Sequence, residues 1–115
     1  MNTYQDGDTI SLWTDNSQRS VTLKNLQTGK RFSYVLKNSF IVGRVKEFSD
    51  LQITTDDKYI SGKHVRFINE NGDVYIEDLH SKNGTKLNGK RISSITRIKS
   101  GDILRVGRSE FEIII

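Results

Sequence analysis

Apolar and polar residues alternate along most of this chain, which is the pattern of β-strands with one buried face. From Val21 onward the period is two, and turn-forming residues interrupt it roughly every ten positions, a spacing typical of sandwiches built from short strands. Asn71-Gly72 is the clearest interruption, because Asn-Gly favours the tight turn of a β-hairpin. The pattern therefore predicts an all-β sandwich of two packed sheets.

Two further segments add detail to this prediction. Gln27-Thr28-Gly29-Lys30 predicts a hairpin turn between two strands, because glycine supplies the backbone conformation that such turns need. On the second of these strands, Phe32, Tyr34 and Leu36 share a face. The ending Ile113-Ile114-Ile115 is continuously apolar, so we expect it to form a covered central strand.

Length and composition favour a single domain. The chain has 115 residues, of which 34% are hydrophobic and 28% charged, as in a globular protein. Residues 1–18 are mostly polar and predict a linker or a loosely attached leading segment, which assigns the folded domain to residues 19–115. The lack of cysteine fits a reducing, cytoplasmic setting, and the Lys/Ile/Asn-rich composition suggests a bacterial protein.

The chain has no apolar run long enough to span a bilayer. We therefore expect no direct membrane insertion, although the domain could be the cytosolic part of a larger or membrane-attached protein.

Three polar groups stand at predicted turns, each beside β-patterned sequence: Gly43-Arg44, Ser61-Gly62-Lys63-His64 and Ser81-Lys82-Asn83-Gly84-Thr85. Arginine offers a planar fork of donors to a phosphoryl group. Serine adds a neutral donor, and glycine lets a backbone N–H approach a ligand closely. Together these residue types predict a phosphate site on loops.

The net charge of +4 favours anionic partners without separating a phosphopeptide from a nucleic acid. A basic nucleic-acid-binding β-domain would need aromatic side chains on which bases can stack. The candidates occupy alternating strand positions, where we expect the core to take most of them: Phe32, Tyr34, Phe67, Tyr75 and Phe111. Nucleic-acid binding is therefore the less favoured hypothesis.

Ser61 and His64 raise a different possibility, a nucleophile and its base in a hydrolase. No acid is fixed by spacing, and the chain lacks a Gly-x-Ser-x-Gly elbow. A buried His64 that hydrogen-bonds the backbone of the 55–62 loop is the preferred interpretation. The chain has two histidines and no cysteine, so we expect no metal site.

The order and spacing of the polar groups resemble those of the forkhead-associated (FHA) family. The shared features are Gly-Arg, Ser-x-x-His, Ser-x-Asn-Gly-Thr with a second Asn-Gly, and Ser-Gly-Asp before a Val-Gly strand, spread between Val21 and Ile115. The resemblance implies an eleven-stranded, antiparallel-rich β-sandwich of the SMAD/FHA type, with its ligand site on loops at one end. It also implies a non-catalytic module that binds phosphothreonine and needs no cofactor.

The resemblance assigns phosphate contacts to Arg44 and Ser61. Gly62 stands where members often have an Arg, Lys or Asn that also touches the phosphate, so only its backbone N–H can serve here. Lys82 stands where Thr or Ser is common. We include Lys63 and Lys82 among the phosphate-binding residues because they would add positive charge nearby.

Asn83 resembles the asparagine that hydrogen-bonds the backbone of the bound peptide. Tyr59 lies where the family reads the third residue after the phosphothreonine. Its ring suggests an apolar or cation–π contact with the ligand rather than a charge pair, unless it only packs on the loop. The resemblance also implies a loop scaffold: Gly43, His64, Gly84, Thr85 and Asn88.

The favoured hypothesis is thus a phosphothreonine-binding module in Ser/Thr kinase signalling, with a kinase substrate as its partner. A degenerate module that contacts its partner without phosphate is the alternative, because Gly62 departs from the family pattern. We expect nucleic acid not to be a partner.

Overall fold

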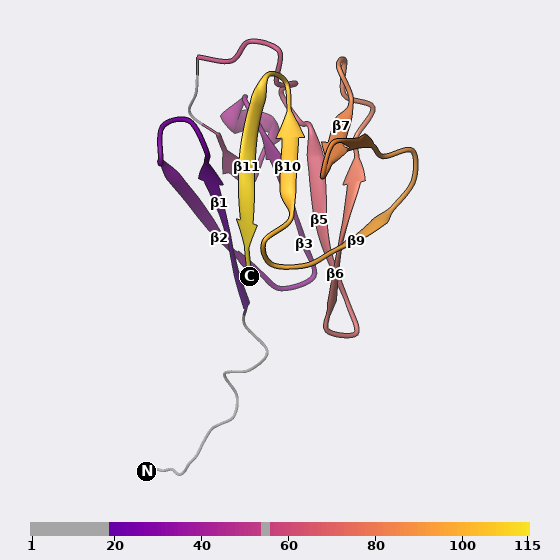
Figure 1. Cartoon of the computed structure of the whole chain (residues 1–115). Coiled ribbons are helices and arrows are strands. Elements are labelled where there is room, and N and C mark those ends of the chain that lie inside the picture. The colour runs from indigo at the N-terminus through magenta and orange to yellow at the C-terminus, as the bar shows by residue number, and fades with distance from the viewer. Residues whose placement is uncertain (1–18, 54–55) are drawn as a thin grey trace.

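A computed structural model describes residues 19–53 and 56–115, which form two β-sheets packed face to face (Figure 1). The predicted leading segment, residues 1–18, lies outside the described residues. The sandwich confirms the all-β fold class. The described residues form the eleven strands expected: β1 (Arg19–Asn25), β2 (Arg31–Leu36), β3 (Ser39–Gly43), β4 (Leu51–Gln52), β5 (Val65–Glu70), β6 (Asp73–Asp78), β7 (Thr85–Leu87), β8 (Lys90–Arg91), β9 (Thr96–Ile98), β10 (Ile103–Val106) and β11 (Ser109–Ile114).

One sheet has the strand order β2-β1-β11-β10-β7-β8, and the other β4-β3-β5-β6-β9. The strand pairs are antiparallel apart from β3 and β4. β11 lies between β1 and β10, which confirms the predicted central strand. Ile113 is fully buried, whereas Ile114 and Ile115 are half-buried, so the expected cover is complete only on the inner face.

Helical structure in the described part of the chain is limited to a single 3₁₀ turn, η3 (Lys46–Phe48), which follows β3. No helix there is long and apolar enough to cross a membrane.

The core lies between the sheets, where inward-facing residues of alternating strands meet. The Phe40 and Phe67 rings stack with centroids 5.1 Å apart. Three of the five predicted core aromatics are buried: Phe32, Phe67 and Phe111. Tyr34 is 37% exposed and Tyr75 is half-buried, so the core takes three of the five, in keeping with the expectation that it takes most of them. Tyr34 lies on the edge strand β2, where its ring contacts Phe40 at 4.9 Å but has no strand beyond it.

The connections gather at two ends of the sandwich (Figure 1). We call one the loop end, with residues 26–30, 44–50, 56–64, 79–84 and 107–108, and the other the turn end, with residues 37–38, 71–72 and 99–102. At the turn end, Asn71 and Gly72 both have positive φ, 54° and 88°. This geometry is that of a type I′ hairpin turn, which confirms the prediction for Asn-Gly.

Candidate functional site

The fold brings most of the predicted site residues together at the loop end. Arg44 follows β3, whereas Ser61 and Gly62 precede β5. The Arg44 N–H donates to the Ser61 carbonyl (3.1 Å), and the Val45 N–H donates to the Gly62 carbonyl (3.2 Å). These bonds tie the chain after β3 to the chain before β5, so they hold the two proposed phosphate ligands beside each other.

The Arg44 side chain is held by the neighbouring loop. Its Nε donates to the Ile60 carbonyl at 2.8 Å, and its own carbonyl accepts a hydrogen bond from Gln52 Nε2 at 3.1 Å. Arg44 is exposed. Because Nε is engaged, the two terminal nitrogens of the guanidinium are the ones that can form a bidentate contact with an anion.

Gly43 allows the close approach on which this arrangement depends. A Cβ at residue 43 would lie 2.0 Å from the Gly62 carbonyl oxygen and 2.5 Å from Ser49 Oγ. That Gly62 oxygen also accepts a hydrogen bond from Ser49 Oγ at 2.7 Å. The lack of a side chain at residue 43 therefore lets the two loops approach each other, and its role in the scaffold of the site stays a prediction.

Ser61 combines a structural and a potential binding role. Its Oγ accepts the Lys82 N–H at 2.9 Å, which joins the 56–64 loop to the 79–84 loop. A hydroxyl that accepts a hydrogen bond can still donate its own proton, so Ser61 can act as a donor to a phosphate. Lys63, two residues after Ser61, and Lys82 are both exposed, and the contribution of their charge to a phosphate site stays a prediction.

His64 is fully buried and braces two loops. The Ser61 N–H donates to its Nδ1 (2.9 Å), and its Nε2 lies 2.8 Å from the Gly84 carbonyl. Because Nδ1 accepts, Nε2 carries the proton and donates to Gly84. Burial lowers the pKa of His64, although the Gly84 carbonyl and nearby carboxylates oppose this, which favours the neutral ring. His64 thus has the role that the sequence suggested.

Asn83 lies beside Ser61 and Arg44 but, in this structure, bonds to its own protein. Its Nδ2 donates to the Tyr59 carbonyl at 2.9 Å. Gly84, the next residue, has a φ of 82°, and a Cβ there would lie 2.8 Å from the Arg91 guanidinium carbon. The positive φ therefore favours glycine at residue 84, whereas the exposed Arg91 side chain could move aside. The Asn83 side chain is exposed and lies next to the 56–64 loop, to which it bonds.

A carboxylate under the 79–84 loop sets its shape. Asp78 Oδ1 accepts the hydroxyls of Ser81 (2.5 Å) and the buried Thr85 (2.7 Å), and Asp78 Oδ2 accepts the Ser81 N–H (3.0 Å). Burial raises the pKa of Asp78, but these hydrogen bonds and the nearby His64 outweigh burial and lower it overall. Thr85 is therefore part of this loop's scaffold.

Asn88 lies apart from this cluster. It occupies the β7–β8 turn with a φ of 51°. Its side chain donates to Asp102 (3.1 Å) and accepts the Ile103 N–H (2.8 Å). Asn88 consequently braces the β7–β8 turn against β10, not the loops that hold Arg44 and Ser61.

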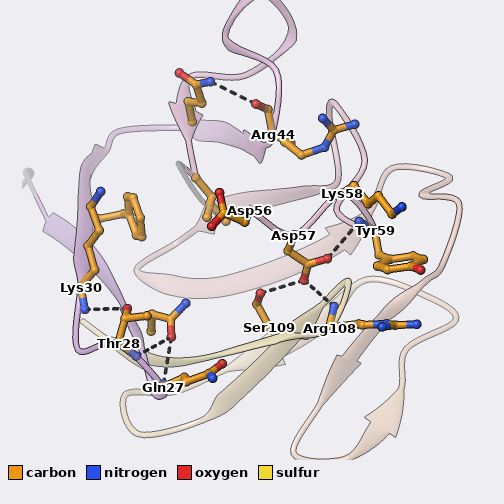
Figure 2. A pocket seen from close by; sticks show the side chains of 14 residues that line it. Gln27, Thr28, Lys30, Arg44, Asp56, Asp57, Lys58, Tyr59, Arg108 and Ser109 are labelled. Atoms are coloured by element: carbon orange, nitrogen blue, oxygen red, sulfur yellow. Dashed lines mark hydrogen bonds between the residues drawn. The ribbon is translucent and has the colours of Figure 1, made fainter.

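The sequence interpretation missed a second brace, which joins the 56–64 loop to the β10–β11 turn (Figure 2). Asp57 accepts the Tyr59 N–H (2.9 Å), the Arg108 N–H (2.6 Å) and the Ser109 hydroxyl (2.7 Å). Burial raises the pKa of Asp57, but these donors and the Arg108 charge lower it overall. No local pattern marks a contact between residues so far apart in sequence.

This brace borders a cavity of about 870 Å³ that adjoins Arg44 and Tyr59 (Figure 2). Its wall is formed by the β1–β2 turn, the described part of the β4–β5 connection and the β10–β11 turn. The cavity and the phosphate-site candidates therefore share residues. Among the described residues, no three His, Asp or Glu side chains cluster as a metal ion would require.

Comparison with known proteins supports the pattern found in the sequence. Residues 40–107, more than half of the chain, match the model of the FHA domain family. The FHA domain-containing protein FhaB of Mycobacterium tuberculosis is 28% identical over 93 residues, which are 81% of this chain and 57% of FhaB. The chain thus spans little more than half of that relative's length.

Solved structures show the same fold. The FHA domain of the CT664 protein from Chlamydia trachomatis superposes with a TM-score of 0.73 and 28% identity, over 84% of this chain and 98% of that one. Mycobacterium tuberculosis EmbR, in complex with a low-affinity phosphopeptide, superposes with a TM-score of 0.69 and 25% identity, over 84% of this chain and 24% of EmbR.

Proposed function

This chain belongs to the FHA family, and from that membership and the geometry of the loop end we propose that it is a non-catalytic module that binds phosphothreonine in partner proteins. The observation that carries the proposal is a set of hydrogen bonds to the 56–64 loop: Arg44 bonds to the Ser61 and Ile60 carbonyls, and the Lys82 N–H bonds to Ser61 Oγ. It brings a guanidinium, a hydroxyl and an ammonium-bearing residue from three segments together on one surface. The phosphopeptide bound to EmbR is consistent with this assignment.

The chemistry of the ligand matches these groups. A phosphothreonine carries close to two negative charges and three acceptor oxygens at neutral pH. Three or four charge-assisted hydrogen bonds could each contribute roughly 1.5–3 kcal/mol, and ordering a flexible peptide offsets part of that. We therefore expect a micromolar dissociation constant, which corresponds to a binding free energy on the order of −8 kcal/mol.

A hydrolase does not fit the positions of Ser61 and His64. His64 uses one ring nitrogen to accept the Ser61 backbone N–H and the other to donate to Gly84. Ser61 Oγ instead bonds to the Lys82 N–H, so the ring does not activate the hydroxyl as a general base would. This geometry supports binding without catalysis. We also propose a cytoplasmic location, which fits a phosphorylated kinase substrate as partner.

Gly62 supports one alternative, a degenerate module with a phosphate-independent partner. A Cβ at this position would lie 3.1 Å from Phe48 Cδ2 and 3.2 Å from Val45 Cγ2. Phe48 and Val45 thus leave little space for a phosphate-contacting side chain at residue 62. Under the favoured proposal, the missing side-chain contact at residue 62 is replaced by the Gly62 backbone N–H and by the ammonium groups of Lys63 and Lys82.

The test is an NMR titration of the labelled domain with a degenerate phosphothreonine peptide pool. Matched pools carry unmodified threonine or phosphoserine. We expect saturable amide shifts at Arg44, Ser61, Gly62 and Asn83 with phosphothreonine only. Arg44→Ala should abolish measurable binding, whereas Arg97→Ala, which removes an exposed arginine paired with Asp73, should not. Equal shifts with unmodified threonine would favour the phosphate-independent alternative.

A further inference from the structure

The ring of Tyr59 already contacts cations of this chain. The Arg108 guanidinium carbon lies 4.1 Å from the ring centroid, and Lys58 Nζ lies 5.9 Å from it. Figure 2 shows the Arg108 side chain running alongside the ring and away from Asp57. A guanidinium beside an aromatic face is attracted by the ring's π electrons. The cation–π contact that the sequence predicted between Tyr59 and a ligand is therefore made with Arg108 of the protein itself.

Arg108 is held in this place by its backbone. The Asp57 carboxylate accepts both the Arg108 N–H and the Tyr59 N–H, through different oxygens. Gly107, before Arg108, has a φ of 60°, and a Cβ there would lie 2.7 Å from Asp57 Oδ2. The turn therefore packs tightly against the loop, so that one carboxylate sets the positions of guanidinium and ring together.

The same loop joins this pair to the phosphate-site candidates. The Tyr59 carbonyl accepts the Asn83 amide, and the next carbonyl, that of Ile60, accepts Arg44 Nε. Asn83 and Arg44, both proposed to touch the phosphopeptide, thus bond to consecutive backbone carbonyls beside the Tyr59 ring. A peptide seated on Arg44 and Asn83 would pass within side-chain reach of Arg108.

We propose that Arg108, stacked on Tyr59, selects phosphothreonine peptides that carry an acidic side chain at a position flanking the phosphorylated residue. This rests on the proposed function and names the ligand class of that same site. The stacked guanidinium is exposed and can pair with a carboxylate through its donor edge. A lysine or arginine of the peptide would be repelled by both Arg108 and Lys58.

The charge around the adjoining cavity points the same way. Its wall carries four cationic and two acidic residues: Lys30, Arg44, Lys58 and Arg108, against Asp56 and Asp57. Asp57 is further committed to backbone and hydroxyl donors. The local field therefore favours a negatively charged peptide segment.

The experiment measures dissociation constants for phosphothreonine peptides with alanine at the flanking positions. A single Glu or a single Lys is moved through each flanking position in turn. We expect one or two positions at which the Glu peptide binds about fivefold to tenfold more tightly than the Lys peptide. The readout is this Lys-to-Glu ratio of dissociation constants.

Variants then assign the ratio to Arg108. Arg108→Ala should bring it close to unity, and Arg108→Glu should invert it. Tyr59→Leu should lower it although the charge remains, because the stacking surface is lost. Arg97→Ala, which also removes one positive charge, should leave the ratio unchanged. Thermal unfolding and the amide spectrum of each variant establish that it is folded.

A ratio that persists in Arg108→Ala, or a wild-type protein without a preference for Glu, would overturn the proposal. Arg108→Lys provides a second check, since it keeps the charge and should retain part of the preference. Failure of the proposed function looks different: phosphorylated and unmodified peptides would then bind equally, whatever their flanking charge.

Discussion

At the loop end, bonds between distant residues join several loops around the candidate site, whereas the turn end combines bonds between residues close in sequence with bonds such as that from Asn69 Nδ2 to the Lys37 carbonyl. His64 bonds to Gly84, and Asn83 bonds to the Tyr59 carbonyl. At the turn end, Lys99 bonds to Asp102 three residues later, through both its backbone N–H and its ammonium group. The long-range contacts of the loop end therefore surround the candidate site, while those of the turn end lie away from it.

This difference has a functional reason. Loops that bind an anion must hold polar groups toward solvent, where few apolar contacts fix them. Crossed hydrogen bonds supply that order in advance, which lowers the entropy cost of binding. Removing one brace at the loop end should therefore disturb the candidate site, and removing one at the turn end should leave the site intact. The predictions below test that contrast, from the largest expected effect to the smallest.

Gly43→Ala should be the most destabilising single methyl addition. Its Cβ would lie 2.0 Å from the backbone oxygen of Gly62, and backbone cannot move aside cheaply, so we expect a loss of about 3 kcal/mol. Gly72→Ala is the turn-end counterpart. There φ is 88° but nothing lies within 4 Å, so the loss should be about 1 kcal/mol from backbone strain alone.

Urea denaturation of the two glycine variants measures both free energies of unfolding. Gly43→Ala should also weaken phosphopeptide binding, because it separates Arg44 from Ser61. An equal or larger loss for Gly72→Ala would show that the close contact of the loops is not what demands glycine at residue 43.

His64→Leu should cost about 2 kcal/mol, since it leaves the Ser61 N–H and the Gly84 carbonyl without their partner. The turn-end counterpart is Asn69→Ala. Asn69 Nδ2 donates to the Lys37 carbonyl at 3.1 Å, but its buried Oδ1 has no hydrogen-bond partner. Asn69→Ala should therefore lower the free energy of unfolding by about 1 kcal/mol or less.

Chemical denaturation and peptide titration of the two variants give complementary readouts. His64→Leu should weaken peptide binding as well as stability, whereas Asn69→Ala should leave binding unaffected. Unchanged peptide affinity in a folded His64→Leu protein would contradict the idea that the braces at the loop end preorganise the site.

Several of these braces could be predicted from the sequence, and others could not. The Asn71-Gly72 turn follows from the preference of two adjacent residues for positive φ. The bracing role of His64 followed from its position beside a polar loop. Both depend on local chemistry. Which of the aromatic residues would stay partly exposed, as Tyr34 does, could not be predicted, because edge position is a property of sheet order, which alternation along one strand does not specify.

The Asp57 brace could not be predicted for a related reason. Asp57 and Arg108 are 51 residues apart and meet only because β11 lies centrally in its sheet and carries the β10–β11 turn to the loop end. Nothing in the polar stretch before Tyr59 distinguishes Asp57 from its neighbour Asp56. The charge beside the Tyr59 ring is consequently a tertiary property, although both residues are visible in the sequence.

Acid should weaken the loop end before the turn end. The folded pKa of His64 lies below its ordinary value of 6.5, chiefly through burial. As pH falls below about 6.5, the unfolded state binds a proton that the folded state resists, so the free energy of unfolding decreases. Asp102 behaves differently, because burial raises its pKa but Lys99 and Asn88 lower it overall, below the ordinary 3.8.

The stabilisation from Asp102 is therefore complete above about pH 3.8 and is lost only as pH falls through its lowered pKa. Urea denaturation of the wild type should show stability declining below pH 6.5, and His64→Leu should lack that part of the decline. If the two profiles run parallel between pH 6.5 and 4, the titration of His64 is not its source.

The smallest expected effect concerns Gly62, where the family often carries a phosphate-contacting side chain. In Gly62→Asn the Cβ would lie 3.1 Å from Phe48 Cδ2, and Phe48 is 60% exposed, so its ring can move aside. The added amide should then tighten phosphopeptide binding about threefold, the effect of one modest hydrogen bond. Gly101→Asn, in open space at the turn end, should leave affinity unchanged. Weaker binding by Gly62→Asn in a calorimetric titration would mean that Phe48 holds its place, and that the site depends on the Gly62 backbone N–H in place of a side chain.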